Sequence, residues 1–187
     1  SFFYGNRLGF LSSDSVILSQ SGQQYNFYHT SAQTLTDADP IDLEASTTKP
    51  ATLHGILPTT QGLILFSKNQ QFLMTAEDNI FTPTKTTIRT ISNYEMDDSV
   101  DPIDMGTNIN FISKTPSYTR IFGMVTRGQD ENPIVLDVGR VVNEWVPATV
   151  DTFIASTQNQ FIAMSSQSED KVYFYLTYSD GEKNIVQ

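Results

Sequence analysis

Three clusters of acidic side chains are the residues of this chain whose types and spacing come closest to those of a catalytic or metal-binding site. They are Asp37, Asp39 and Asp42; Asp97, Asp98, Asp101 and Asp104; and Glu169 with Asp170. Two carboxylates that flank a sugar can hydrolyse a glycosidic bond, and carboxylate oxygens can hold calcium, although no cluster has the spacing and turn glycine of an EF-hand loop. Clustering in sequence does not place two carboxylates at a working distance. We therefore expect solvated loop acids and predict no catalytic or metal-binding residues.

Other signatures of chemistry are absent from the sequence. There is no cysteine, so no disulfide or thiolate metal site is available. Two histidines leave little for imidazole chemistry, and we expect His54 to be half-buried and hydrogen-bonded. No Gly-x-Ser-x-Gly elbow, Walker loop or Gly-x-Gly-x-x-Gly motif occurs. The sequence predicts neither an enzyme nor a cofactor.

A carbohydrate-binding or glycan-hydrolysing domain is the alternative function. Such a site needs exposed aromatic rings beside paired carboxylates. The candidates are Glu144 with Trp145, and Tyr173 and Tyr175 with Glu169 and Asp170.

Short apolar runs separated by polar turns must position these residues. The first runs, Leu8 to Leu11, Val16 to Leu18 and Tyr25 to Tyr28, read as an antiparallel meander. No amphipathic helix of ten or more residues is visible. We predict strands near residues 8–12, 15–20, 24–28, 62–67, 70–75, 86–91, 108–112, 120–126, 160–165 and 171–178.

The pattern of strand, turn and strand recurs along the chain. Units that begin at Leu8, Leu63, Ile109 and Phe161 are separated by 55, 46 and 52 residues. Repeats of about 40–50 residues are typical of propeller blades, because one small sheet must pack on its neighbours. We predict one all-β domain of repeated short antiparallel sheets, β-propeller-like, with blade-like units at 1–50, 51–104, 105–150 and 151–187. A β-sandwich is the alternative fold.

The expected core follows from the apolar positions of these strands. We predict burial of Leu8, Phe10, Ile17, Leu63, Leu65, Phe72, Phe111, Phe122, Phe161 and Phe174.

The length and the net charge of the chain limit its possible functions further. The chain has 187 residues, and its acidic residues exceed the basic ones by 21 − 11 = 10. This balance argues against a nucleic-acid binder that follows phosphates with clustered Lys and Arg. The longest apolar run, Leu63 to Phe66, is too short for a membrane span. Because the chain lacks an initiator Met and a signal peptide, and stops inside a strand-like pattern, we expect an internal fragment of a longer protein.

The first half of the chain contains an ordered series of motifs: Asn6 to Leu11, Val16 to Ser19, Tyr25 to Tyr28, Asp37 to Asp42, Leu53-His54, Leu63 to Ser67, Gln71 to Leu73 and Phe81 to Pro83. This series resembles the tail tubular protein B family, the tail nozzle proteins of T7-like podoviruses. These motifs cover residues 1–85. From Met105 onward the likeness is one of pattern, with Gly106, an apolar strand and Ser117-Tyr118-Thr119.

This resemblance implies a structural protein of the virion tail, made in the host cytoplasm, with a β-propeller-like body. Its copies would form a hexameric ring that contacts the portal adaptor (tail tubular protein A) and the tail fibre proteins. An axial channel would pass genomic DNA during ejection without binding it specifically. No catalytic residue carries over from such a family. If the chain lines a channel, we expect the acidic loop with Asp97, Asp98, Asp101 and Asp104 to face it.

Overall fold

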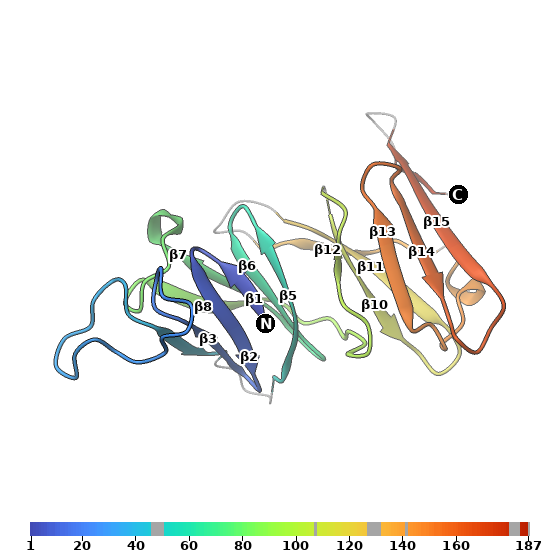
Figure 1. Ribbon diagram of the computed structural model, residues 1–187. Coiled ribbons are helices and arrows are strands. Elements are labelled where there is room, and N and C mark those ends of the chain that lie inside the picture. Colours follow the sequence, from blue (N-terminus) through green and yellow to red (C-terminus); the bar gives the residue numbers. More distant parts are fainter. Residues whose placement is uncertain (46–50, 107, 127–131, 141, 180–183, 187) are drawn as a thin grey trace. The chain divides into compact units, whose positions relative to one another are not determined.

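The structure is a computed structural model that describes residues 1–45, 51–106, 108–126, 132–140, 142–179 and 184–186 (Figure 1). Two compact units divide the chain, Ser1–Tyr94 (unit 1) and Glu95–Gln187 (unit 2). About half of the residues lie in strands. The helical residues form single 3-10 turns, η1 (Glu77–Asn79) and η2 (Asn143–Trp145). The predicted all-β fold of repeated short antiparallel sheets is confirmed.

Unit 1 consists of two four-stranded antiparallel meanders, each in chain order. The first contains β1 (Phe2–Tyr4), β2 (Arg7–Ser12), β3 (Ser15–Leu18) and β4 (Ile41–Glu44). The second contains β5 (Leu53–Thr59), β6 (Gly62–Ser67), β7 (Gln71–Ala76) and β8 (Thr86–Ser92). One core joins the two sheets, because successive side chains of a strand point to opposite faces and the apolar ones gather on the facing sides. It includes Val16, Leu18, Ile41, Leu53, Leu63, Leu65, Phe72, Met74 and Phe81.

Unit 2 repeats this plan with two further four-stranded sheets. The first contains β9 (Ile103–Asp104), β10 (Ile109–Lys114), β11 (Thr119–Val125) and β12 (Ile134–Asp137). The second contains β13 (Thr152–Ser156), β14 (Phe161–Ser165), β15 (Val172–Ser179) and β16 (Asn184–Val186). The core of unit 2 includes Ile112, Ile121, Val150, Phe153, Ile162, Met164 and Tyr175. Burial raises the pKa of Tyr175 to about 12, and its hydroxyl donates a hydrogen bond of 3.0 Å to the carbonyl of Val138.

The first sheet corrects the predicted meander. Residues 24–28 do not form a strand, and a bend follows the turn at Gly22. The sheet takes β4 instead, which pairs with β3 from Leu18↔Ile41 to Ser15↔Glu44. Strand β1, which pairs with β2, completes it. Residues 19–40 therefore leave the sheet as a long loop, light blue in Figure 1.

The predicted core is confirmed in part, and two of its ten positions are wrong. Leu63, Leu65, Phe72, Phe111 and Phe122 are buried. Leu8, Ile17 and Phe161 are half-buried, while Phe10 and Phe174 are exposed. The wrong positions lie on strands that are apolar on both faces, so periodicity does not reveal which face packs inward. In β3 and β14 the inward face carries Val16 and Leu18, and Ile162 and Met164.

The single domain and its four blade-like units, and the closure of the sheets into a propeller, stay predictions.

Candidate functional site

The connection between β3 and β4, residues 19–40, is the longest link between successive strands in the part of the chain that the structure describes. Neighbouring antiparallel strands need only two to five residues to connect them. Long connections without secondary structure of their own are usually functional when they are ordered. We call this segment the 19–40 loop.

Arg7 organises the base of the 19–40 loop. Its side chain is 1% exposed, and its guanidinium donates hydrogen bonds only to backbone carbonyls. The acceptors are Ser19 O at 2.7 Å, Asp39 O at 2.7 Å, Asp37 O at 2.8 Å, Ala38 O at 3.2 Å and Phe81 O at 3.2 Å. Burial lowers the pKa of Arg7, while the nearby Asp39 carboxylate raises it. Because these bonds join both ends of the loop to the core, Arg7 holds the loop closed at its base.

Asp39 fixes the loop from inside. Its carboxylate accepts hydrogen bonds from Thr36 N at 2.7 Å, Thr30 Oγ1 at 2.7 Å and Thr30 N at 3.0 Å. The bond from Thr36 N, followed by those from Thr30, holds the pKa of Asp39 well below its usual range. Since Asp39 is fully buried and already satisfied by these donors, it is a structural carboxylate.

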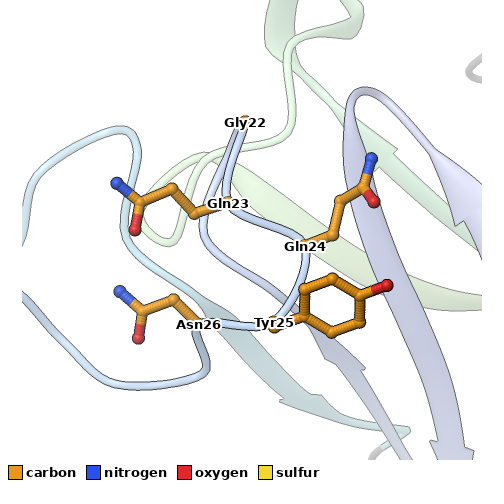
Figure 2. Close-up of a pocket in the computed structure, with 5 residues that line it drawn as sticks. All are labelled: Gly22, Gln23, Gln24, Tyr25 and Asn26. Carbon is orange, nitrogen blue, oxygen red and sulfur yellow. The ribbon is translucent and has the colours of Figure 1, made fainter.

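The tip of the loop presents aromatic and amide side chains. A single bridge between Gln20 and Gln23 closes the turn at Gly22, whose φ of +75° suits glycine. An open hollow of about 630 Å³ is lined by Gly22, Gln23, Gln24, Tyr25 and Asn26. Figure 2 shows Gln24 and Tyr25 extending to one side of the loop, and Gln23 and Asn26 to the other. Tyr25 is 90% exposed.

The predicted acidic loop, residues 97–104, divides into one structural acid and three outward ones. Asp97 forms an ion pair with Lys114 and accepts hydrogen bonds from Ser99 N and Ser99 Oγ at 3.0 and 2.9 Å. Burial raises the pKa of Asp97, but the bonds from Lys114 and Ser99 outweigh it, so the pKa is lowered. Asp98, Asp101 and Asp104 are exposed. Buried Met96 and Val100 anchor the segment between them.

The remaining acids are either hydrogen-bonded to side chains or exposed. The Glu169 carboxylate accepts hydrogen bonds from Tyr173 OH at 3.1 Å and Thr149 Oγ1 at 3.3 Å. Burial raises the pKa of Tyr173, and its bond to Glu169 adds to this. Asp37, Asp42 and Asp170 are exposed, whereas Asp39 of the first cluster is buried.

The other aromatic candidates and the two histidines differ in their exposure. Trp145, in η2, is 75% exposed, and Glu144 beside it is also exposed. Tyr175 is buried in the core and is therefore no ligand platform. His29 is exposed. The prediction that His54 is half-buried is wrong: it is exposed beside a bulge in β5, which turns it from the core.

Within the described ranges, no group of three or more His, Cys, Asp or Glu side chains gathers to hold a metal. Nor does any helix of those ranges have the length and apolar character needed to span a membrane.

Sequence reasoning did not identify Arg7 or the loop tip. One signal was available: no Asp, Glu, Lys or Arg occurs from Ser15 to Thr36, in a chain that is otherwise acidic. An uncharged polar stretch of this length, with Gln, Asn and Tyr, marks the tip as distinct from the rest of the surface.

Comparison with known proteins identifies the family. A family model described as "Bacteriophage nozzle protein" matches residues 1–187. Tail tubular protein gp12 of Escherichia phage T7 is 30% identical over 177 residues, which cover 93% of this chain and 22% of that relative. The chain thus spans about a fifth of the length of the curated relative that it matches. The all-β chain described above therefore belongs to the bacteriophage nozzle protein family, a structural family of the virion tail.

Proposed function

We propose that this chain is a structural part of the nozzle of a short phage tail and contributes to the conduit through which DNA leaves the virion. The main support for this proposal is that the nozzle family model matches the whole chain. The charge supports it, since a surplus of ten acids repels phosphates and lets a duplex pass without adhering.

The proposed assembly is a hexameric ring of copies of the nozzle protein, with the portal adaptor and the tail fibre proteins as further partners. Within this chain, the four sheets would act as blade-like units of one propeller-like body. The acids Asp98, Asp101 and Asp104 are exposed, as a channel-facing loop requires. Asp97 would serve that loop by fixing its base through Lys114.

The proposed role needs no catalysis. A retaining or inverting glycosidase needs two carboxyl groups that face one glycosidic bond. Glu169 is occupied by Tyr173 and Thr149, and Asp39 by Thr30 and Thr36, so both acids have structural partners. A non-enzymatic role is the simpler account of these contacts.

Electron microscopy of the assembled nozzle protein that carries this sequence tests the conduit. We expect a ring with an open axial channel, and an antibody against residues 97–104 that binds only after the ring is dissociated. A compact particle without a channel would contradict the proposal. Antibody binding to the intact ring would contradict only the placement of the acidic loop.

Incubation with host capsule polysaccharide tests the catalytic alternative. We expect no new reducing ends. Reducing ends that appear with the native chain and disappear in Glu169→Gln or Asp101→Asn would favour a hydrolase instead.

A further inference from the structure

We infer that the tip of the 19–40 loop is a binding site for a neutral glycan, with Tyr25 as its stacking platform and Gln24, which extends to the same side of the loop, as its hydrogen-bonding group. This inference is independent of the conduit role.

The conformation of the tip is restricted before any ligand binds, because hydrogen bonds fix the rest of the loop. Arg7 ties the loop ends to the core, and Asp39 ties Thr30 and Thr36 together. Nearer the tip, Gln20 N donates to Asn26 O at 2.8 Å and Tyr28 N donates to Asn26 Oδ1 at 3.0 Å. A site held by its own hydrogen bonds loses little conformational entropy when a ligand binds.

Aromatic rings on this loop serve two different purposes. Phe27 packs against Phe10 with ring centroids 5.8 Å apart and so belongs to the scaffold. Tyr25 and Tyr28, in contrast, are 90% and 82% exposed. Exposed rings of this kind offer an apolar face with a polar hydroxyl, which suits a ligand that is apolar on its ring faces and polar at its edges.

Amide side chains complete this chemistry. The amide of Asn26 is used within the loop, since it donates to Gln20 Oε1 and accepts from Tyr28 N. Gln24 is exposed, lines the hollow and extends to the same side of the loop as Tyr25, whereas Gln23 extends to the other side (Figure 2). Each amide offers two donors and one acceptor oxygen, which match sugar hydroxyl groups that both donate and accept.

The charge of the loop and the size of the hollow indicate which class of ligand could bind there. The stretch from Ser15 to Thr36 has no Asp, Glu, Lys or Arg, so it offers a charged ligand no permanently charged side chain. The surplus of ten acids over the whole chain opposes uronic acids and phosphates. The hollow of about 630 Å³ falls within the usual range for small ligands. A neutral oligosaccharide satisfies all three conditions.

An array of neutral and acidic bacterial surface oligosaccharides tests the inference with the intact chain. We expect binding to neutral glycans that falls at least tenfold in Tyr25→Ala and in Gln24→Ala, and that persists in Tyr25→Phe. These side chains are exposed, so the variants should fold, and unchanged thermal midpoints confirm that. Trp145→Ala is the matched control, because it removes another exposed aromatic ring, and it should leave binding unchanged.

Four outcomes would overturn the inference. They are an array without binding, a preference for acidic glycans, binding that is equal in Tyr25→Ala, and binding that is lost in Trp145→Ala. In the first case the tip would serve a protein contact, and in the last the glycan site would lie at η2.

Discussion

Arg7 and Asp39 are a buried cation and a buried anion whose side chains form hydrogen bonds mainly with backbone groups. Arg7 donates to five carbonyl groups, and the Asp39 side chain accepts from the backbone N–H groups of Thr30 and Thr36 and from the Thr30 hydroxyl. Buried charges are tolerated only when their hydrogen-bonding capacity is used. The two residues therefore replace a regular hairpin with a closed loop whose backbone groups are satisfied.

The depressed pKa of Asp39 predicts a loss of stability in acid. Its stabilising effect is fully present above the ordinary aspartate pKa of about 4 and is lost as the pH falls toward the lower folded value. The thermal midpoint should fall from pH 5 to pH 2.5 more steeply in the native chain than in Asp39→Asn. Asp42→Asn, at an exposed position of β4, is the control and should keep the native slope. Equal slopes in the native chain and Asp39→Asn would show that other acids cause the loss.

Gly62 marks a position where the backbone admits no side chain. Its φ is +141°, and an added Cβ would lie 2.2 Å from the carbonyl oxygen of Met74. The backbone conformation alone should cost about 1–3 kcal/mol for another residue, and the clash with β7 adds to this. Gly62→Ala should therefore destabilise more than Gly106→Ala, where φ is +83° but nothing lies within 4 Å. Urea unfolding of both variants measures the difference, and equal costs would contradict the clash.

At the scale of elements, strands with two apolar faces set the architecture. In β6 every residue is buried. In β15, Tyr175 lies in the core while Val172, Phe174 and Leu176 are exposed on the opposite face. A sheet with one solvated face normally alternates apolar and polar residues, so β15 carries more apolar surface than the core of its unit uses.

Two phenylalanines on such strands should respond differently to truncation. Phe72 is 1% exposed and packs in the core of unit 1, so Phe72→Ala should cost about 3–5 kcal/mol. Phe174 is 58% exposed, and Phe174→Ala should change stability by less than about 0.5 kcal/mol. Chemical denaturation of both variants checks this, and an unchanged midpoint for Phe72→Ala would show that the core is misplaced.

Strand positions were more predictable than strand faces. The predicted ranges 62–67, 86–91 and 160–165 lie close to β6, β8 and β14, because turn residues and β-branched runs mark the ends of strands locally. The face depends on which neighbouring sheet covers a strand, and this is a non-local fact that periodicity cannot give for Phe161 or Phe174. The strand predicted at 24–28 failed for a related reason, because its aromatic residues resemble a strand while Arg7 holds the segment in a loop.

At the scale of the whole molecule, the outer face of β13, β14 and β15 is apolar and uncharged. Cross-strand neighbours Phe161↔Leu176 and Ala163↔Phe174 extend it, and the rings of Phe161 and Phe174 meet edge to face at 5.7 Å. Ile154 on β13 is 58% exposed. Contiguous exposed apolar surface of this kind marks a contact site, which agrees with a part in a larger tail assembly.

This face predicts weak association of the chain at high concentration. We expect a monomer or weak oligomer by sedimentation equilibrium. The variants Phe174→Ser and Leu176→Ser should reduce the association. Tyr25→Ser, at an exposed ring on another sheet's loop, is the control. A stable hexamer of this chain alone would contradict the expectation.

The charge of the molecule predicts feeble binding to DNA. Each phosphate contact by Lys or Arg adds to the affinity and to its salt dependence, and tight binding to duplex needs several of them. This chain has eleven basic residues against 21 acidic ones. Among the basic residues, Arg7 is buried against carbonyl groups and Lys114 is paired with Asp97. We therefore expect no sequence-specific binding in fluorescence anisotropy with labelled duplex, and at most a weak signal that disappears as salt is raised from about 20 to 150 mM.

Replacing Asp98, Asp101 and Asp104 by Asn should strengthen that weak signal if their charges repel the duplex, whereas Asp37→Asn/Asp42→Asn on unit 1 is the matched control. Tight binding by the native chain at 150 mM salt would contradict a conduit through which DNA passes freely.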